Sequence, residues 1–433
     1  MAQVDPVILI PGITAVYLKD QYPLPPEYVW TVLRKEYERV ALHPNDLRYE
    51  VEGPSRLKPD QLYEIAYKEI IEELRYNLRS REDRPVPVYP FSYDWRMRLD
   101  DIQDQLDDFV EEVIDRTKIL KHYHQAGYSQ NPKVNLLGHS MGGLIITGYL
   151  RKKGPNSPVN KVVTLATPYQ GSFEAVIKIT TGTADLGTSP PSSREREAAR
   201  ITPALYHLLP SFKHGIETDP GIPDSLFQME AWQPGIVQTI KEWVRLKGLP
   251  TEPPMQLAEK IFANLLADAK QHREEIDKFK LADAGLTSDR WLAVLGVDSI
   301  TRVHLKIIKR GKSPQFLLQS SDRRNNWDPK GHITEERRFT GDGTVPFEGA
   351  IPKFLNEKNL VCVSPDDYGY WELEDKALAK IGGFHGILPN MNMIHRLIVR
   401  FLTDNPDKHG NTWGRRAPGV VDWSPPLTLS EKT

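Results

Sequence analysis

A serine between two glycines is the clearest candidate for chemistry in this sequence. The segment NLLGHSMGGL, residues 135–144, places Gly138, Ser140 and Gly142 in the pattern G-x-S-x-G, between a predicted strand and a predicted helix. In this pattern the serine occupies a strained turn, and the glycines avoid collisions with neighbouring backbone. N–H groups at the start of the following helix favour developing negative charge. Ser140 is therefore predicted to be a nucleophile rather than part of a simple turn, and His139 to pack or contact substrate.

A serine nucleophile needs a histidine base, which an acid must orient. Among the 12 histidines, His385 lies in the glycine-containing segment GGFHGILPN, directly before a helix predicted over residues 391–402. His395 lies inside that helix, where a packing or surface role is favoured. We therefore predict His385 as the base.

Several aspartates compete for the role of the acid. Asp342 lies between two glycines in GDGTVP, as expected of a sharp turn at a strand end, and Asp298 in LGVDSI is its rival. Asp366 and Asp367 are weaker candidates. Because Gly-Asp-Gly is also an ordinary turn sequence, spacing alone leaves the choice open.

Short apolar runs alternate with helical patterns along the chain. The runs cover residues 7–10, 86–91, 134–137, 162–165, 291–297 and 360–363. Such continuous runs indicate strands buried on both faces, as in parallel sheets. Helical periodicity covers residues 62–78, 102–114 and 144–150. The alternation predicts an α/β fold with a mostly parallel sheet flanked by helices.

The alternation breaks after Gly171, and this break suggests the domain organisation. Residues 1–171 and 290–404 are predicted to form the α/β core, with a loop-rich insertion at 19–59. Residues 172–289 are mostly helical and polar, and we interpret them as an inserted helical cap rather than ordinary surface helices. The Pro- and Gly-rich tail, 405–433, is expected to be extended or packed on the surface.

Composition limits the classes of function. The chain has 433 residues, with 56 Lys plus Arg and 58 Asp plus Glu, so its net charge of −2 argues against a nucleic-acid partner. Cys362 is the only cysteine, which excludes a disulfide within the chain, and its apolar flanks predict a buried strand residue. The N-terminus lacks a signal-peptide pattern, and no apolar run reaches the roughly 20 residues of a membrane span. We expect a cytoplasmic protein; peripheral membrane contact and oligomeric state stay open.

Six motifs in a fixed order resemble one known family. VILIPGI, YDWR, GHSMGG, TLATPYQGS, GDGTVP and HGILPNMNMIH together resemble the lecithin:cholesterol acyltransferase-like family of α/β-hydrolases. The likeness covers roughly residues 5–171 and 290–403, and TPALYHLLPS within the cap adds to it. The resemblance implies an α/β-hydrolase fold whose catalytic residues are Ser140, Asp342 and His385. It favours Asp342 over Asp298, and it implies no metal and no cofactor.

The resemblance also suggests residues around the triad. Two backbone N–H groups must form the oxyanion hole; Met141 follows the nucleophile, and Ile13 follows the first strand. The segment from Tyr93 to Arg96 follows a strand and is expected to line or brace the site, a brace by Asp94 and Arg96 being equally favoured. The side chains predicted near the substrate are Tyr93, Trp95, His139, Thr167, Tyr169 and Gln170.

These features predict a serine hydrolase that cleaves carboxylic esters of a lipid-like kind through an acyl-enzyme. One alternative is an acyltransferase that moves an acyl chain from a phospholipid to an alcohol. Another is a non-catalytic or partner-gated effector on the same fold. The chain departs from the secreted, disulfide-containing animal members of the family, and it is more similar to a microbial member.

Overall fold

The central sheet of the computed structural model has six strands, and every neighbouring pair is parallel. The structure describes residues 3–52, 55–182, 193–324, 340–406 and 414–428. The strand order is β14-β9-β7-β6-β1-β5. The strands are β1 (Val7–Ile10), β5 (Val88–Pro90), β6 (Val134–His139), β7 (Val159–Leu165), β9 (Trp291–Gly296) and β14 (Val361–Val363). Each predicted strand is present, and the predicted α/β fold with a mostly parallel sheet is confirmed.

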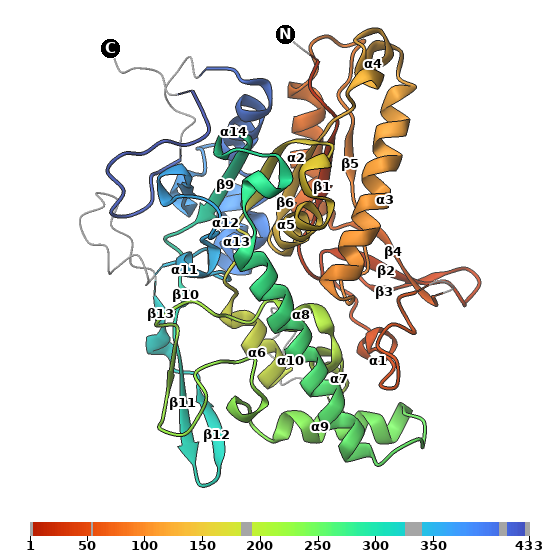
Figure 1. The fold of residues 1–433 in the computed structure, drawn as a ribbon, viewed down its shortest axis with the longest axis vertical. Helices are drawn as coiled ribbons and strands as arrows, with labels where there is room; N and C mark the ends of the chain where they lie inside the picture. The colour runs from red at the N-terminus through yellow and green to blue at the C-terminus, as the bar shows by residue number, and fades with distance from the viewer. Residues whose placement is uncertain (1–2, 53–54, 183–192, 325–339, 407–413, 429–433) are drawn as a thin grey trace.

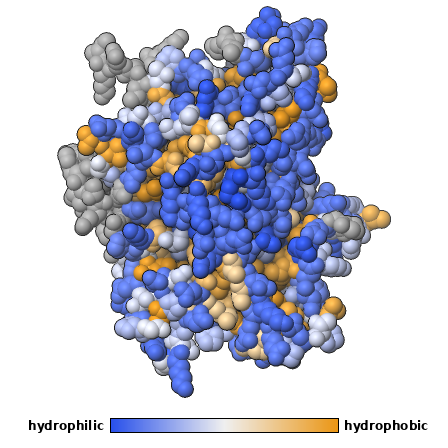
Figure 2. All heavy atoms as spheres, viewed as in Figure 1, coloured by the Kyte–Doolittle hydropathy of each residue, from blue (hydrophilic) through white to orange (hydrophobic). Residues whose placement is uncertain are grey.

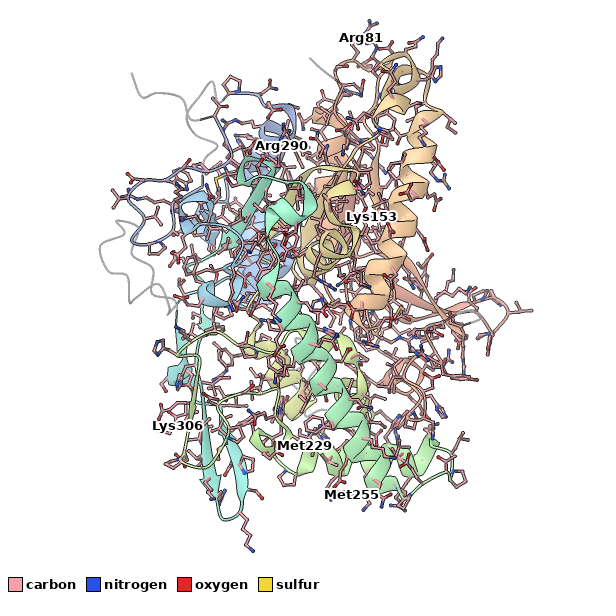
Figure 3. All side chains as sticks on the ribbon, viewed as in Figure 1. Arg81, Lys153, Met229, Met255, Arg290 and Lys306 are labelled. Atoms are coloured by element: carbon pink, nitrogen blue, oxygen red, sulfur yellow. The ribbon has the colours of Figure 1, made fainter. Side chains whose placement is uncertain are left out.

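Helices cover this sheet, so its strands are buried on both faces. All residues of β1 and β6 are buried, which explains the continuous apolar run VILI of β1 and the mainly apolar sequence of β6. Helix α3 (Leu99–Lys118) packs on α5 (Met141–Lys153), and α2 (Glu64–Asn77) packs on α14 (Asn392–Thr403). Lys153, labelled in Figure 3, donates to Asp107 over 2.6 Å and links the C-terminal end of α5 to the middle of α3.

The insertion after β1 is more regular than the predicted loop-rich segment. It forms a three-stranded antiparallel sheet from β2 (Val16–Asp20), β3 (Glu27–Trp30) and β4 (Leu57–Leu62), with a short helix α1 (Tyr37–Val40). Val16, Leu18 and Asp20 of β2 are buried and alternate with partly exposed residues. This period of two is typical of a half-buried strand, but the surrounding prolines hide it in the sequence.

In its described residues, 172–182 and 193–289, the region predicted as a cap contains five α-helices and one short strand. They are α6 (Phe173–Thr181), α7 (Ser193–Ile201), α8 (Pro203–His207), α9 (Gly235–Lys247), α10 (Pro254–Lys278) and β8 (Ile216–Thr218). In Figure 1 they lie below the central sheet. Strand β8 pairs with β11 (Leu305–Arg310), which forms a hairpin with β12 (Ser313–Leu317). A second hydrophobic cluster therefore combines the cap helices with residues beyond 172–289, while the domain division itself stays a prediction.

The described part of the C-terminal tail packs on the outer strand of the sheet. Arg415 and Cys362 exchange two backbone hydrogen bonds of 2.7 Å, and the indole N–H of Trp423 donates to the carbonyl of Leu360 over 2.8 Å. The tail thus covers part of the exposed edge of β14, where free N–H and C=O groups would otherwise face solvent.

The remaining elements are short and lie mainly around the late strands. They are α4 (Lys121–Gln125), β10 (Thr301–Arg302), β13 (Arg323–Arg324), α11 (Phe347–Ala350), α12 (Leu373–Gly382) and α13 (Phe384–Ile387). Within the described ranges, no helix is both long enough and apolar enough to cross a membrane. The face drawn in Figure 2 is mainly hydrophilic, with its hydrophobic residues in separate small patches.

Candidate active site

Ser140 occupies a strained turn between β6 and α5. Its backbone angles are φ 53° and ψ −127°, outside the regions that L-residues ordinarily adopt. A Cβ atom at Gly142 would lie 2.2 Å from the carbonyl oxygen of Ile10, and one at Gly138 would lie 2.8 Å from the backbone of Gly142. Both positions therefore require glycine, and the turn matches the geometry that the G-x-S-x-G pattern predicts.

The structure brings Ser140, His385 and Asp342 together from three distant segments. The His385 Nε2 atom lies 2.9 Å from Ser140 Oγ, and its Nδ1 atom lies 2.7 Å from Asp342 Oδ2. The other carboxylate oxygen of Asp342 accepts hydrogen bonds from the backbone N–H groups of Thr344 and Val345, at 2.9 and 2.6 Å. These bonds fix the orientation of the carboxylate toward the histidine.

This geometry assigns the tautomer of His385. A carboxylate oxygen only accepts, so Nδ1 carries the proton that is shared with Asp342. Nε2 is then an acceptor that faces the hydroxyl of Ser140, as a general base must. The backbone N–H of His385 also donates to the carbonyl of Asp342 over 2.9 Å, which ties the two segments together.

The loop after β1 lies against the serine and is held by two buried tyrosines. The Tyr93 hydroxyl donates to the carbonyl of Pro11 over 2.7 Å, and the Tyr67 hydroxyl accepts from the N–H of Gly12 over 2.9 Å. Because Gly12 is engaged in this way, its N–H cannot serve an oxyanion. Within the described part of the chain, no partner is found for the N–H groups of Ile13 and Met141, the two predicted oxyanion donors.

The segment from Tyr93 to Arg96 is buried and makes bracing contacts, while contact of Tyr93 and Trp95 with substrate stays a prediction. Arg96 is fully buried, binds both carboxylate oxygens of Asp94, and donates to the backbone carbonyls of Val40 and Glu50 in the insertion. Trp95 is 4% exposed. Its ring packs on that of Trp30, with centroids 4.7 Å apart. The buried ion pair therefore fastens the insertion to the core.

The other side chains predicted near the substrate are also buried. Thr167 packs against Gly143 at the start of α5, and the Tyr169 ring meets that of Phe354 edge to face. The Gln170 side-chain amide donates to Asp277 of α10 over 2.9 Å. The sixth, His139, is buried between Tyr67 and His385. Their contact with substrate stays a prediction.

The rival acid and base lie in other surroundings. Asp298 has a positive φ of 65°, and burial raises its pKa. Asp367 pairs with Arg415 of the tail. The His395 ring bonds to the carbonyl of Pro389 over 2.7 Å inside α14, which is a packing role. In the structure, His385 contacts both Asp342 and Ser140, as expected of the predicted base.

Tyr67 is the residue at this site that the sequence did not reveal. It lies on α2, among the regularly spaced apolar residues that mark the buried face of that helix. A tyrosine at such a position reads as a core residue. No local motif links it to Gly12, 55 positions away, so only the folded structure shows the contact.

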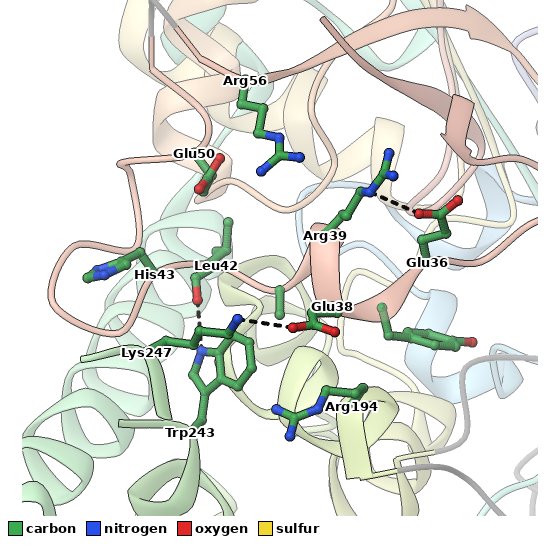
Figure 4. A pocket seen from close by; sticks show the side chains of 12 residues that line it. Glu36, Glu38, Arg39, Leu42, His43, Glu50, Arg56, Arg194, Trp243 and Lys247 are labelled. Atoms are coloured by element: carbon green, nitrogen blue, oxygen red, sulfur yellow. Dashed lines mark hydrogen bonds and ion pairs between the residues drawn. The ribbon is translucent and has the colours of Figure 1, made fainter. Parts of the chain in front are cut away.

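Two cavities lie between the insertion and the cap, and neither includes the triad. The first, of about 560 Å³, is shown in Figure 4 and combines four cationic side chains with Glu36, Glu38 and Glu50. Its charges are largely paired: Lys247 binds Glu38, and Arg39 binds Glu36. The second, of about 460 Å³, lies against α10.

Ser140 and His385 are only 6% and 9% exposed, so access to the triad is restricted. No described cluster of three or more His, Cys, Asp or Glu residues could hold a metal ion.

Comparison with known proteins gives a family match and a structural neighbour. The family model described as lecithin:cholesterol acyltransferase matches residues 55–238. The crystal structure of the Tle4–Tli4 complex matches with a TM-score of 0.61 and 14% identity, over 93% of this chain and 99% of that chain. At this identity the likeness concerns the fold alone. No curated protein sequence matches significantly.

Two further solved structures, lipid-cleaving enzymes by their descriptions, are much less similar in structure. The monoacylglycerol lipase of Paleococcus ferrophilus has a TM-score of 0.30 and 14% identity, over 93% of this chain and 96% of that chain. Phospholipase PlaB of Legionella pneumophila has a TM-score of 0.27 and 12% identity, over 68% and 39%. The family resemblance predicted from the motifs is confirmed by the match over residues 55–238, and the chain has the α/β-hydrolase fold.

Proposed function

We propose that this chain is a serine hydrolase of carboxylic esters, with a lipid-like substrate. The observation that carries the proposal is the position of His385, which bonds at once to Ser140 Oγ over 2.9 Å and to Asp342 Oδ2 over 2.7 Å. A histidine base that lies between a serine nucleophile and an orienting acid is the arrangement that activates a serine.

The reaction follows from these contacts. His385 takes the proton of Ser140 as the oxygen attacks the ester carbonyl, and Asp342 stabilises the imidazolium that forms. The N–H groups of Ile13 and Met141 bind the developing oxyanion. His385 then protonates the leaving alcohol, which leaves an acyl group on the serine. Water attacks the acyl-enzyme with the same base, and the acid product departs.

The family match supports a lipid as the source of the acyl group. An acyltransferase, which passes the acyl group to an alcohol, uses the same residues and differs in how well the site excludes water. The 6% exposure of Ser140 supports this second candidate, because a closed site protects an acyl-enzyme from hydrolysis. The same closure supports a partner-gated effector that opens at a membrane or on a protein.

Hydrolysis of p-nitrophenyl esters of increasing chain length tests the proposal. Wild type should turn over at least one ester, and Ser140→Ala should lose that activity. Ser321→Ala, which alters an exposed serine outside the triad, is the matched control and should retain it. A Ser140→Ala variant with unchanged turnover would refute the role of the serine.

Two additions to this assay separate the alternatives. Phospholipid vesicles together with a long-chain alcohol distinguish hydrolysis from transfer, because transfer yields a new ester in place of free fatty acid. Comparison of the rates on short esters with and without vesicles detects gating and peripheral membrane contact. A wild-type enzyme that is inactive alone but active with vesicles would favour the gated form.

A further inference from the structure

We propose that Tyr67 and His139 are positioning residues that hold the oxyanion loop and the catalytic histidine in one fixed geometry. This inference rests on the proposed function. His139, the residue before the nucleophile, and Tyr67 of α2 thereby receive a role that is not that of nucleophile, base or acid.

A continuous chain of hydrogen bonds carries the inference. The N–H of Gly12 donates to the hydroxyl oxygen of Tyr67 over 2.9 Å. That hydroxyl lies 2.8 Å from His139 Nδ1. The His139 Nε2 atom lies 3.0 Å from the carbonyl oxygen of His385. All four residues belong to different segments of the chain, and the three side chains involved are at least nine-tenths buried.

The carbonyl of His385, at the end of this chain of hydrogen bonds, determines the direction of every bond in it. A carbonyl oxygen only accepts, so His139 must carry its proton on Nε2 and donate it to His385. Nδ1 of His139 is then an acceptor, and the Tyr67 hydroxyl must donate to it. The oxygen of Tyr67 keeps a lone pair for the N–H of Gly12. Every donor therefore has an acceptor, and reversal of any one bond would leave a buried group unpaired.

This arrangement requires a neutral His139. Burial, followed by the neighbouring His385, lowers the pKa of His139 well below its ordinary value. Burial also raises the pKa of Tyr67, which keeps its hydroxyl protonated. The rings of His139 and His385 are 5.0 Å apart. A neutral neighbour permits His385 to become cationic during catalysis, whereas a charged one would oppose it.

The chain of bonds connects the two halves of the site. At one end it fixes the peptide before Ile13, whose N–H is a predicted oxyanion donor. At the other end it fixes the backbone of His385, whose ring must remain within reach of Ser140. Tyr93 supports the same loop by a separate bond to Pro11. Loss of the Tyr67 hydroxyl therefore affects catalysis without touching substrate.

Tyr67→Phe is the direct test, because it deletes one oxygen and keeps the ring. Tyr123→Phe is the matched control. Tyr123 is also fully buried and donates to a backbone carbonyl, that of Val4 over 2.7 Å, but it lies in α4 and outside the site. The melting temperature of each variant is measured alongside, and kinetics are compared at a temperature at which both are folded, so a difference in kinetics reports position rather than folding.

The kinetic readout separates positioning from general destabilisation. Tyr67→Phe should lower kcat on a p-nitrophenyl ester about 10- to 100-fold with little change in KM, since small misplacements of catalytic groups cost about that much. Inhibition by an alkyl trifluoromethyl ketone, which places an oxyanion in the hole, should weaken by a similar factor. Tyr123→Phe should keep wild-type kcat. Equal kcat for both variants would overturn the proposal.

Variants at His139 provide a second route if Tyr67→Phe does not fold. His139→Gln keeps one acceptor and one N–H donor, whereas His139→Leu has neither. Activity should be partly retained in the glutamine variant and lost in the folded leucine variant. Equal loss in both would show that size, and not hydrogen bonding, is what the position requires, and it would refute the inference.

Hydrogen exchange makes the outcome independent of any substrate. Exchange at the N–H of Gly12, followed in the peptide that contains residues 11–16, should be faster in Tyr67→Phe than in Tyr123→Phe. If wild type cleaves no ester but this difference appears, the proposed function fails and the hydrogen-bond chain stands. If wild type is active but neither exchange nor kcat changes in Tyr67→Phe, the positioning role fails and the hydrolase stands. Faster exchange with unchanged kcat would also refute the positioning role.

Discussion

Asp342→Asn should abolish nearly all turnover while leaving the fold intact. The carboxylate receives three hydrogen bonds: Oδ1 accepts from the N–H groups of Thr344 and Val345, and Oδ2 faces His385 Nδ1. In the variant the amide oxygen must keep the two backbone donors. The amide NH₂ is then forced toward Nδ1 of the histidine.

That substitution reverses the tautomer of His385. With an N–H donor opposite it, Nδ1 becomes an acceptor, and the proton moves to Nε2, which faces Ser140. The histidine can then no longer accept the proton of the serine. In serine proteases the same error of tautomer lowers kcat by about 10⁴-fold. This factor corresponds to about 5.4 kcal/mol of transition-state stabilisation.

The assay is kcat/KM on the best p-nitrophenyl ester, with the melting temperature as the test of folding. Asp298→Asn is the control, because Asp298 was the rival acid in the sequence. Asparagine tolerates its positive φ of 65°. The control should keep wild-type activity. The reasoning is refuted if Asp342→Asn retains more than a tenth of the activity, or if both variants lose it equally.

Three further variants test packing and charge. Gly142→Ala should unfold more easily, by roughly 1–3 kcal/mol, because the new Cβ would lie 2.2 Å from the carbonyl of Ile10; urea titration measures this, and Gly235→Ala, where nothing lies within 4 Å, should be unaffected. Burial raises the pKa of Asp5 from 3.8 to about 6, so its ionisation lowers the stability of the fold progressively as the pH rises between these values. Asp5→Asn should therefore raise the melting temperature at pH 8 and bring little gain at pH 4; a gain independent of pH would contradict this. Burial lowers the pKa of His272 well below 6.5, so the unfolded chain binds the proton first and stability falls as the pH drops below 6.5. The stability deficit of His272→Gln at pH 7.5 should narrow by pH 5, and a constant deficit would count against this cause.

Local sequence was sufficient where local sterics decide the structure. The turn at Ser140 follows from its flanking glycines, since a side chain at Gly142 would collide with the backbone of β1. The six core strands were visible because burial on both faces makes apolar residues predominate in short continuous runs. Sequence spacing alone could not choose between Asp342 and Asp298, because both lie in turns next to a strand.

Pairing between strands far apart in the chain produced the features that were not predicted from the sequence, or were predicted too simply. The insertion after β1 contains a sheet because β2 pairs with both β3 and β4, the latter about 40 residues away. Strand β8 of the predicted cap pairs with β11, which belongs to the chain beyond the cap. An alternating pattern of only three to five residues is too short to predict which strands pair with one another.

The sequence by itself determined the strained serine, the parallel sheet and the family resemblance, because each depends on residues adjacent in the chain or on apolar periodicity. The resemblance favoured Asp342, but only the tertiary structure places its carboxylate against His385 and shows that Tyr67 and His139 link the loop at Gly12 to the histidine. Those contacts join segments up to 246 positions apart. Their hydrogen bonds depend on the direction of side chains in the packed core, which no local pattern encodes.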